Sequence, residues 1–560
     1  MEDLMKILKI ALILLILAVL PVAAGGRQDT AARPADSAAI VTRPGQLPIV
    51  TQLLTLSIGM RQSPQVQDYD TNFATLYLER RSGIKTEFKM FSSSGTDSNT
   101  QFELMVTSNE KLPDIMYFAP GNWMNFGDSG VFIDLTPYYD NWAFFHNQRL
   151  NDEKIDDATR NLIKMRSTAP SGKRYGWAEI RPNEVNTYYG MNFINYKWLD
   201  QLGLKMPTTT EEFYNVMTAF RDRNPNGQGN VIPWLANTTM WSAQPLHFLI
   251  NAFVYYPFDA MTNEANLNVT NGKLWTPWTT EEFRDALRYI NRLHNAGIFT
   301  AAMFTITQQE MQAIISYQPG EVNRVGMFSS GPTLTLMPET PAIYDYTAQV
   351  SLTGPKGVNY YPKVQIMTSD PHLFITKDCL YPEAAFRWMD FLHERDASFT
   401  LRYGEKDVDW RLIRPEENIK DLVGGVAQYV ETNVLWGLPN NKHWNTASGT
   451  FWYLGAGTRQ AQTGGWIGDR WKLFGNVSIN DGKDVDEKVL DIFYTRQEED
   501  AIREIRSSLN AYRQEAMALF ITGAMDLDRD WNTYIQTLDR IGLQRYLQTA
   551  QTAYTRTIGK

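Results

Sequence analysis

The stretch YGMNFINYKWLDQLGLKMPTTTEEFYNVMTAFRDRNPNGQGNVIPW, residues 189–234, joins several structural devices in one order. An apolar run at 189–195 predicts a strand, and a Leu-Gly-Leu turn at Gly203 follows it. Thr209 stands three residues before Glu212, the spacing at which a hydroxyl and a carboxylate cap the free amides of a helix start. The stretch therefore predicts a strand, a turn and a capped helix in succession.

The predicted helix has one apolar face, and a turn-rich loop ends it. Its apolar residues recur at helical spacing, and Pro225 with two nearby glycines then stops the helix. The apolar face consists of Phe213, Val216, Met217 and Phe220.

The order of these devices resembles the extracellular solute-binding proteins of bacterial ABC importers, specifically the large family 1 type that binds oligosaccharides. The matching pieces are the strand, Trp-Leu-Asp-x-Leu-Gly-Leu, the Pro-Thr-Thr-x-Glu helix start and the Asn-Pro-Asn-Gly-x-Gly loop. Two further blocks are similar to the same family, TKDCLYPEA at 376–384 and FITGAMDLDRDWNTYIQTLDRIGLQRYLQTAQTAY at 520–554. The resemblance covers most of residues 48–560.

The chain of 560 residues is too long for one hydrophobic core. Strand and helix signals alternate between residues 54 and 117, which predicts an open α/β sheet whose ligands lie beyond the carboxyl ends of its strands. The resemblance implies a two-lobe periplasmic-binding-protein-like (type II) fold with a hinge between the lobes and a helical C-terminal segment. The boundaries we expect are 48–186 plus 360–425 for lobe one, and 187–359 plus 426–560 for lobe two.

Two helix ends can be placed from local signals. A second capping box is predicted at Thr279 and Glu282, where it opens an amphipathic helix. Apolar residues from Ile502 to Leu519 lie three and four apart, which predicts a long helix that ends near Gly523.

The N-terminus is typical of an export signal. Lys6 and Lys9 precede the apolar run 10–20, and small residues at 22–24 predict cleavage after Ala24, so that residues 1–24 form a signal peptide. The run is shorter than the ~20 residues that span a bilayer, which leaves a retained anchor as the alternative. Residues 25–47 are rich in Ala, Gly, Pro, Asp and Thr and predict a flexible tether.

The cysteine content narrows the localisation. Cys379 is the only cysteine, so the chain has no disulfide framework and no lipid-bearing cysteine after its signal. We therefore expect an exported protein in the periplasm or at the outer face of the cytoplasmic membrane.

The sequence lacks the motifs of several enzyme classes. The chain has no G-x-x-x-x-G-K-[ST] loop, no G-x-S-x-G elbow and no H-E-x-x-H pair. The net charge of −9 argues against nucleic acid as a partner. We expect a protein that is not an enzyme and has no cofactor.

One loop, at residues 224–230, is a candidate for calcium binding. Relatives implied by the resemblance often carry an acidic version of the loop Asn224–Asn230 that chelates calcium, but here the first position is Asn and the acidic pair before Ile-Pro is missing. A plain Asn/Gly turn is favoured, with weak calcium binding as the alternative.

Candidate ligand contacts come mainly from tryptophans. The resemblance implies that residues 172–181 pass beside a cleft between the lobes, and Trp123 follows the third predicted strand. An indole against the apolar face of a sugar, with a few polar groups, is the usual composition of a sugar site. For most single tryptophans, ordinary core packing is the competing interpretation. The candidates are Trp123, Trp177, Glu179, Arg181, Tyr188, Trp241, Trp436 and Trp444.

These observations predict a receptor that captures an oligosaccharide between its lobes and delivers it, as a monomer, to the permease of an ABC importer. One alternative is a protein that binds peptides or a modified solute. The other is a secreted glycan-active enzyme, because paired carboxylates cannot be recognised from sequence spacing.

Overall fold

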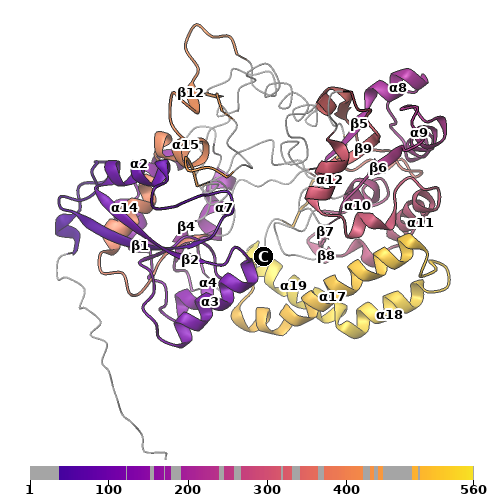
Figure 1. Cartoon of the computed structure of the whole chain (residues 1–560). Coiled ribbons are helices and arrows are strands. Elements are labelled where there is room, and N and C mark those ends of the chain that lie inside the picture. Colours follow the sequence, from indigo (N-terminus) through magenta and orange to yellow (C-terminus); the bar gives the residue numbers. More distant parts are fainter. Residues whose placement is uncertain are drawn as a thin grey trace, which may run out of the picture.

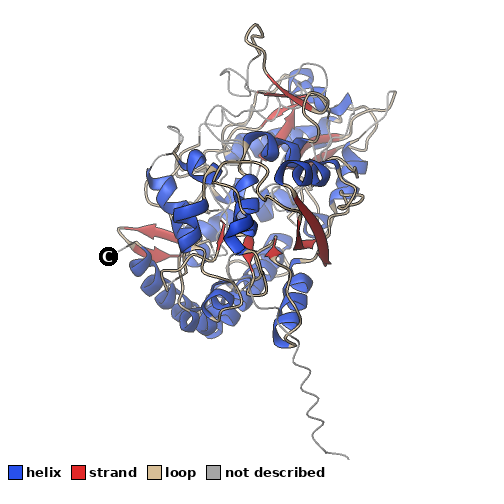
Figure 2. Cartoon of the chain, turned by 90° about the vertical axis from the view of Figure 1, so that its left-hand side faces the viewer, coloured by secondary structure: helices blue, strands red, loops and turns tan. Residues whose placement is uncertain are grey.

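The computed structural model describes residues 37–121, 123–151, 155, 157–169, 171–177, 191–238, 245–257, 266–316, 320–330, 341–362, 371–419, 429–433, 439–444, 482–489 and 492–558. They form two α/β lobes that stand side by side, with C-terminal helices below lobe two (Figure 1). Viewed from the side of lobe one, helices lie on more than one side of the strands (Figure 2). Within these residues, none of the helices has the length and apolarity needed to cross a bilayer.

The sheet of lobe one has the strand order β2-β1-β3-β11-β4. β1 is parallel to both β2 and β3, whereas β11 is antiparallel to β3 and β4. This arrangement is the open sheet that the alternating strand and helix signals predict. The strands are β1 Leu54–Arg61, β2 Ile84–Phe91, β3 Ile115–Met116, β4 Gly176–Trp177 and β11 Leu373–Ile375.

Helices connect and cover this sheet, and local caps define their ends. Asn72 accepts the amide of Ala74 at the start of α2, and Gly83 ends that helix at φ 74°, which a residue with a side chain rarely adopts. The helices of lobe one are α2 Phe73–Ser82, α3 Gly95–Thr107, α4 Trp123–Asp128, α5 Thr136–Trp142, α6 Phe145–Leu150, α7 Asp157–Arg166, α14 Pro382–Phe391 and α15 Arg395–Tyr403.

Lobe two holds a second sheet of order β10-β5-β9-β6. β6 and β9 are parallel, and β5 is antiparallel to β9 and β10. Its elements are β5 Met191–Asn195, α8 Tyr196–Leu202, α9 Thr210–Arg223, β6 Ile232–Leu235, α10 Pro245–Ile250, the hairpin β7 Asn268–Thr270 and β8 Lys273–Trp275, α11 Glu281–Asn295, α12 Gln308–Ile315, β9 Val325–Ser330 and β10 Tyr346–Ala348.

One of the two predicted capping boxes is confirmed and the other is displaced. At α9, Thr209 Oγ1 accepts the amide of Glu212, and the Glu212 carboxylate accepts the amide of Thr209. At α11 the cap is Thr280, which accepts the amide of Phe283, so the prediction of Thr279 is wrong by one residue. A short 3-10 turn at Pro277–Thr279 takes up the predicted cap and moves the helix start along the chain.

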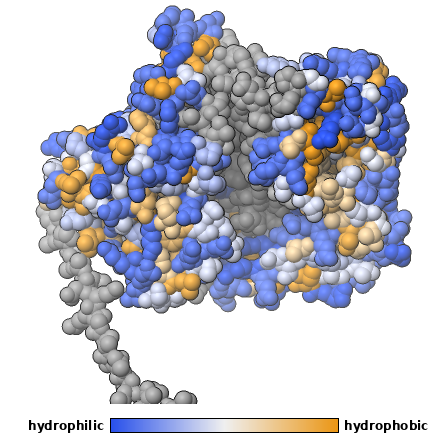
Figure 3. Space-filling model, in the orientation of Figure 1, coloured by the Kyte–Doolittle hydropathy of each residue, from blue (hydrophilic) through white to orange (hydrophobic). Residues whose placement is uncertain are grey.

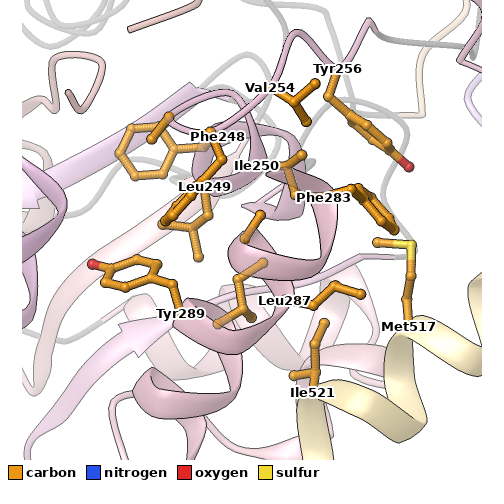
Figure 4. Close-up of a cluster of buried hydrophobic side chains, with 14 of the residues drawn as sticks. Phe248, Leu249, Ile250, Val254, Tyr256, Phe283, Leu287, Tyr289, Met517 and Ile521 are labelled. Carbon is orange, nitrogen blue, oxygen red and sulfur yellow. The ribbon is translucent and has the colours of Figure 1, made fainter. Parts of the chain in front are cut away.

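The C-terminal segment is helical, as the resemblance implies. α17 (Arg496–Thr522) ends at Gly523 with φ 80°, and α18 (Trp531–Ile541) and α19 (Leu543–Thr557) follow. Met517 and Ile521 on α17 point toward Phe283 and Leu287 of α11 (Figure 4). The C-terminal helices therefore share the hydrophobic core of lobe two.

The described segments alternate between the lobes along the sequence, with three changes of lobe among them. The chain leaves the first sheet at Trp177 and enters the second at Met191, then returns between β10 and β11. Trp444 packs in the core of lobe one. The carbonyl oxygen of Lys483 accepts the amide of Tyr361, whose neighbour Tyr360 donates its amide to Asn251 O in lobe two. The third change of lobe therefore falls between Trp444 and Lys483. Segments that join two lobes are where a hinge can bend, because a few loop residues can absorb the change in backbone angles.

The expected lobe boundaries need one correction. Residues 429–433 and 439–444 belong to lobe one, although we expected them in lobe two. β13 (Tyr429–Glu431) pairs with β12 (Trp410–Leu412), and Trp444 Nε1 donates to Thr75 Oγ1 at 2.9 Å. A segment late in the sequence thus completes the first lobe through contacts that no local pattern signals.

The expected tether at 25–47 also needs a correction, because residues 37–47 are folded onto lobe one. They form a 3-10 turn at Ser37–Ile40, and Val41 pairs with Val50. The buried guanidinium of Arg387 donates to the carbonyl oxygens of Thr42 at 2.9 Å and Gln46 at 3.0 Å. A buried cation needs acceptors, and this segment supplies them. The predicted signal peptide and residues 25–36 lie outside the described residues.

Candidate functional site

A pocket of about 440 Å³ lies at the carboxyl edge of the lobe-one sheet. The parallel strands β1 and β2 end at Arg61 and Phe91, and most of the lining comes from the last residues of β2 and the segment after β1. Ligands of open α/β sheets bind beyond the carboxyl ends of the strands, so this is the expected place for a site. The lining residues are Gln62, Ser63, Pro64, Val66, Gln67, Asp68, Tyr69, Asp70, Phe88, Met90 and Ser93.

The lining combines aromatic rings with uncharged and acidic polar groups. The rings of Tyr69 and Phe88 have centroids 5.4 Å apart, and Met90 lies beside Phe88 on the same face of β2. Amides, hydroxyls and carboxylates supply the polar part. This is a composition suited to a polyhydroxylated ligand, which presents apolar faces and many hydroxyl groups.

Asp68 shapes the rim of this pocket. Its carboxylate accepts the amide of Asp70 at 2.8 Å and the hydroxyl of Thr71 at 2.9 Å. The hydrogen bond from the Thr71 side chain, together with the amide of Asp70, holds the pKa of Asp68 below its usual value, so the group stays ionised. Asp70 remains exposed beside it.

A second segment clamps the pocket loop from behind. The amide of Gln67 donates to Asn440 O, and the amide of Asn440 donates to Gln65 O, both at 3.0 Å. Asn72 Nδ2 donates to His443 O at 3.2 Å. The pocket is thus assembled from residues 62–93 and fixed by residues 440–444.

Trp444 supports this pocket from beneath. Its ring is fully buried, with centroids 5.7 Å from Phe88 and 6.4 Å from Tyr69, both of which line the pocket. The Thr75 hydroxyl accepts its indole N–H and donates to Tyr69 O at 2.6 Å. With no exposed face, Trp444 does not fit the predicted role of a ligand contact and instead holds the aromatic floor in place.

Trp177 is likewise a core residue. It is 0% exposed, and four rings surround it at centroid distances of 4.6–4.9 Å. A stacking role on a ligand does not fit this position, because every face of the indole is already covered. The surrounding rings are Tyr139, His146, Phe386 and His393.

Trp123 lies where the sequence predicts, at the carboxyl end of β3, but it is turned inward. It is 6% exposed and its ring lies 5.9 Å from that of Phe374. The remaining candidates, Glu179, Arg181, Tyr188, Trp241 and Trp436, lie outside the described residues and stay predictions.

Sequence reasoning missed the pocket loop and Arg61. Arg61 Nε donates to Ser98 Oγ at 2.7 Å, and its guanidinium lies 4.6 Å from the centroid of the Phe118 ring. Arg61 therefore ties the end of β1 to α3 and to the segment after β3. The available signal was the polar, turn-rich run QSPQVQDYD at 62–70, directly after the first predicted strand.

Lobe two has polar groups at the corresponding edge of its own sheet. The parallel strands β6 and β9 end there, and Ser329 Oγ donates to Asn192 Oδ1 at 2.6 Å and accepts Trp234 Nε1 at 3.0 Å. The buried hydroxyl of Ser330 has no hydrogen-bond partner within the described part of the chain. Each lobe thus places polar side chains at a carboxyl edge.

The loop Asn224–Asn230 does not fit calcium. Asn224 Oδ1 accepts the amide of Gly229 at 2.8 Å, and Asn226 Oδ1 accepts the amide of Gln228 at 3.0 Å. Asn226 Nδ2 donates to Asn230 Oδ1 at 2.7 Å. The side-chain oxygens that a hard cation needs are engaged inside the loop, which contains no carboxylate. Across the residues described, no three His, Cys, Asp or Glu side chains gather as a metal site would require.

The arrangement defines the class of two-lobe binding proteins, in which two α/β lobes joined by a hinge hold a ligand between them. The two lobes stand side by side (Figure 3). Residues 63–397 match the family described as Bacterial extracellular solute-binding protein, and the chain belongs to this family.

Comparison with known proteins extends the match to nearly the whole chain. It is 22% identical to the fructooligosaccharide ABC transporter substrate-binding protein FusA of Streptococcus pneumoniae, with 97% of each chain covered. The solved structure of FusA in complex with kestose matches with a TM-score of 0.70, 20% identity and coverage of 90% of this chain and 99% of FusA. The structure of the alginate-binding protein AlgQ2 without calcium ion matches with a TM-score of 0.65, 19% identity and coverage of 91% and 100%. These likenesses confirm the two-lobe fold.

Proposed function

We propose that this protein is a receptor that captures an oligosaccharide between its lobes and delivers it to the permease of an ABC importer. The observation that carries the proposal is the pocket at the carboxyl edge of lobe one, where Tyr69 and Phe88 provide an aromatic floor beneath amide, hydroxyl and carboxylate groups. The similarity to FusA, a fructooligosaccharide ABC transporter substrate-binding protein, supports the same function.

The proposed mechanism is hinge closure. Each lobe has its own sheet and its own buried core, so the lobes can move as units while the crossing segments bend. A ligand that contacts both carboxyl edges stabilises the closed form relative to the open one, and the population shifts accordingly. The permease then recognises the closed form.

The receptor works as a monomer, in the periplasm or at the outer face of the cytoplasmic membrane.

The Asp68 carboxylate has the character of a ligand contact in a receptor rather than of a glycosidase acid. A glycosidase needs one carboxylic acid whose pKa is raised so that it can protonate the leaving oxygen. The carboxylate of Asp68 has its pKa lowered by the Thr71 hydroxyl and the Asp70 amide, which suits a hydrogen-bond acceptor. We therefore propose binding without cleavage. We also propose that binding does not depend on a metal ion, because the loop 224–230 contains no carboxylate and its amide oxygens accept hydrogen bonds within the loop.

Calorimetric titration of the mature chain with oligosaccharides and with peptides tests the proposal. We expect one or more oligosaccharides to bind and to raise the melting temperature, since a ligand at 100 times its Kd adds about 2.7 kcal/mol of stability. The same samples should release no new reducing ends during prolonged incubation. Binding of peptides alone, or release of reducing ends, would replace the proposal with one of its alternatives.

A further inference from the structure

The charged groups of the pocket are of one sign. Asp68 and Asp70 line it, and no Lys, Arg or His does so among the residues described. The hydrogen bond from the Thr71 hydroxyl and the amide of Asp70 lower the pKa of Asp68, which favours its charged form. A ligand that enters this pocket therefore meets carboxylates and neutral polar groups.

The cationic side chains nearest to the pocket in the sequence make their contacts outside it. Arg61, next to Gln62, donates to Ser98 and Asn99 and lies over Phe118. Lys89 alternates with Phe88 and Met90 along β2, so it points to the opposite face of the sheet, where it pairs with Glu110.

The clamp segment repeats this pattern. Lys442 is the cationic residue of the clamp, and its ammonium is held by the buried carboxylate of Asp409 at 2.9 Å. Its positive charge is therefore matched within lobe one and is not available to balance an anion in the pocket.

We propose that the pocket selects neutral oligosaccharides and rejects those built from uronic acids. This inference rests on the proposed function and names the substrate class. A carboxylate accepts strong, charge-assisted hydrogen bonds from sugar hydroxyls, whereas it repels the carboxylate of a uronate. The fold itself does not decide the matter, because the similar structures include a complex with the neutral sugar kestose and a protein whose name states that it binds alginate, a polyuronate.

The two aspartates have different parts in this selectivity. Asp68 is held by Thr71 and by the amide of Asp70, so it maintains the loop as well as the charge. Asp70 is exposed at the pocket and can meet a ligand directly. Asp70 is therefore the residue to change, because its replacement leaves the turn around Asp68 in place.

The test compares neutral and uronate oligosaccharides of matched length by calorimetric titration, with kestose and malto-oligosaccharides against oligogalacturonates and alginate oligomers. At low ionic strength we expect a neutral sugar to bind and uronates to bind with an affinity at least about tenfold lower. The difference should shrink in high salt, because exposed charges are screened.

Charge reversal at Asp70 locates the effect. Asp70→Lys should weaken neutral binding by about tenfold and reduce the discrimination against uronates, since it removes an acceptor and replaces a negative charge with a positive one. Asp140→Lys changes the net charge equally at an exposed position that does not line the pocket and should leave both affinities within twofold.

The outcomes separate the two proposals. Uronates that bind as tightly as neutral sugars, or neutral binding that Asp70→Lys leaves unchanged, would overturn the selectivity while the receptor function stands. A folded protein that binds no oligosaccharide of either class would overturn the proposed function itself.

Discussion

Replacement of Trp177 by alanine distinguishes a core residue from a ligand platform. The indole is 0% exposed, and four rings pack around it at 4.6–4.9 Å. Loss of a buried tryptophan costs about 3 to 5 kcal/mol, because the transfer free energy of the ring is lost and a cavity remains. With so many rigid aromatic neighbours the site cannot collapse easily, so the upper half of that range is expected.

The melting temperature provides the assay. A domain of this size loses roughly 2 to 4 °C per kcal/mol, which predicts a fall on the order of 10 °C for Trp177→Ala in scanning calorimetry. Trp275→Ala is the matched control, since Trp275 is only partly buried in the β7–β8 hairpin, where its indole N–H donates to Thr270 Oγ1. We expect a distinctly smaller fall for the control.

Ligand affinity measured well below the melting temperature completes the comparison. A core residue predicts that the folded Trp177→Ala protein binds its oligosaccharide within about twofold of the wild type. A melting temperature near that of the wild type, together with a tenfold loss of affinity, would refute this reasoning and restore the stacking role.

Three further predictions follow from single features. Addition of a chelator should leave the melting temperature unchanged, because amide hydrogen bonds hold the loop 224–230; a fall of several degrees that calcium restores would contradict this. The free energy of unfolding should fall from pH 7 to pH 5, because burial lowers the pKa of His146 to about 3 and that of His393 well below 6.5. Over this range the two histidines take up protons in the unfolded chain but stay neutral in the folded chain. Burial raises the pKa of the Asp390 carboxyl to about 6, so this single group has the opposite effect on the pH dependence and only partly offsets the two histidines. His146→Gln should make the melting temperature measured by calorimetry depend less on pH, and an unchanged pH dependence would contradict the role of His146. Arg387→Met should release residues 37–47, so that trypsin cuts after Arg43 faster than in wild type or in the exposed control Arg395→Met; equal rates would contradict the contact.

Local signals predicted the elements well, because caps and periodicity act within a few residues. The box of Thr209 and Glu212 and the glycine end of α17 are present as expected. The start of α11 moved by one residue because Pro277 and Trp278 form a turn of their own. The strand and helix order of lobe one similarly follows from short-range patterns.

The candidate site was predicted less well, because its contacts are long-range. Trp444 lies in an Asn-rich stretch that suggests a surface loop, yet its indole bonds to Thr75, 369 residues away in the chain. Residues 37–47 have the composition of a linker, but the acceptors that they offer to Arg387 lie more than 340 residues from it. Composition describes a segment alone, whereas burial depends on which distant segment meets it.

Small-angle scattering of the mature protein, with and without a saturating neutral oligosaccharide identified by calorimetry, tests the central claim most directly. Capture between two lobes predicts that the radius of gyration falls on binding and that the scattering curve changes toward a more compact particle. Tight binding with an unchanged radius of gyration would contradict closure around the ligand and place the sugar on one lobe alone.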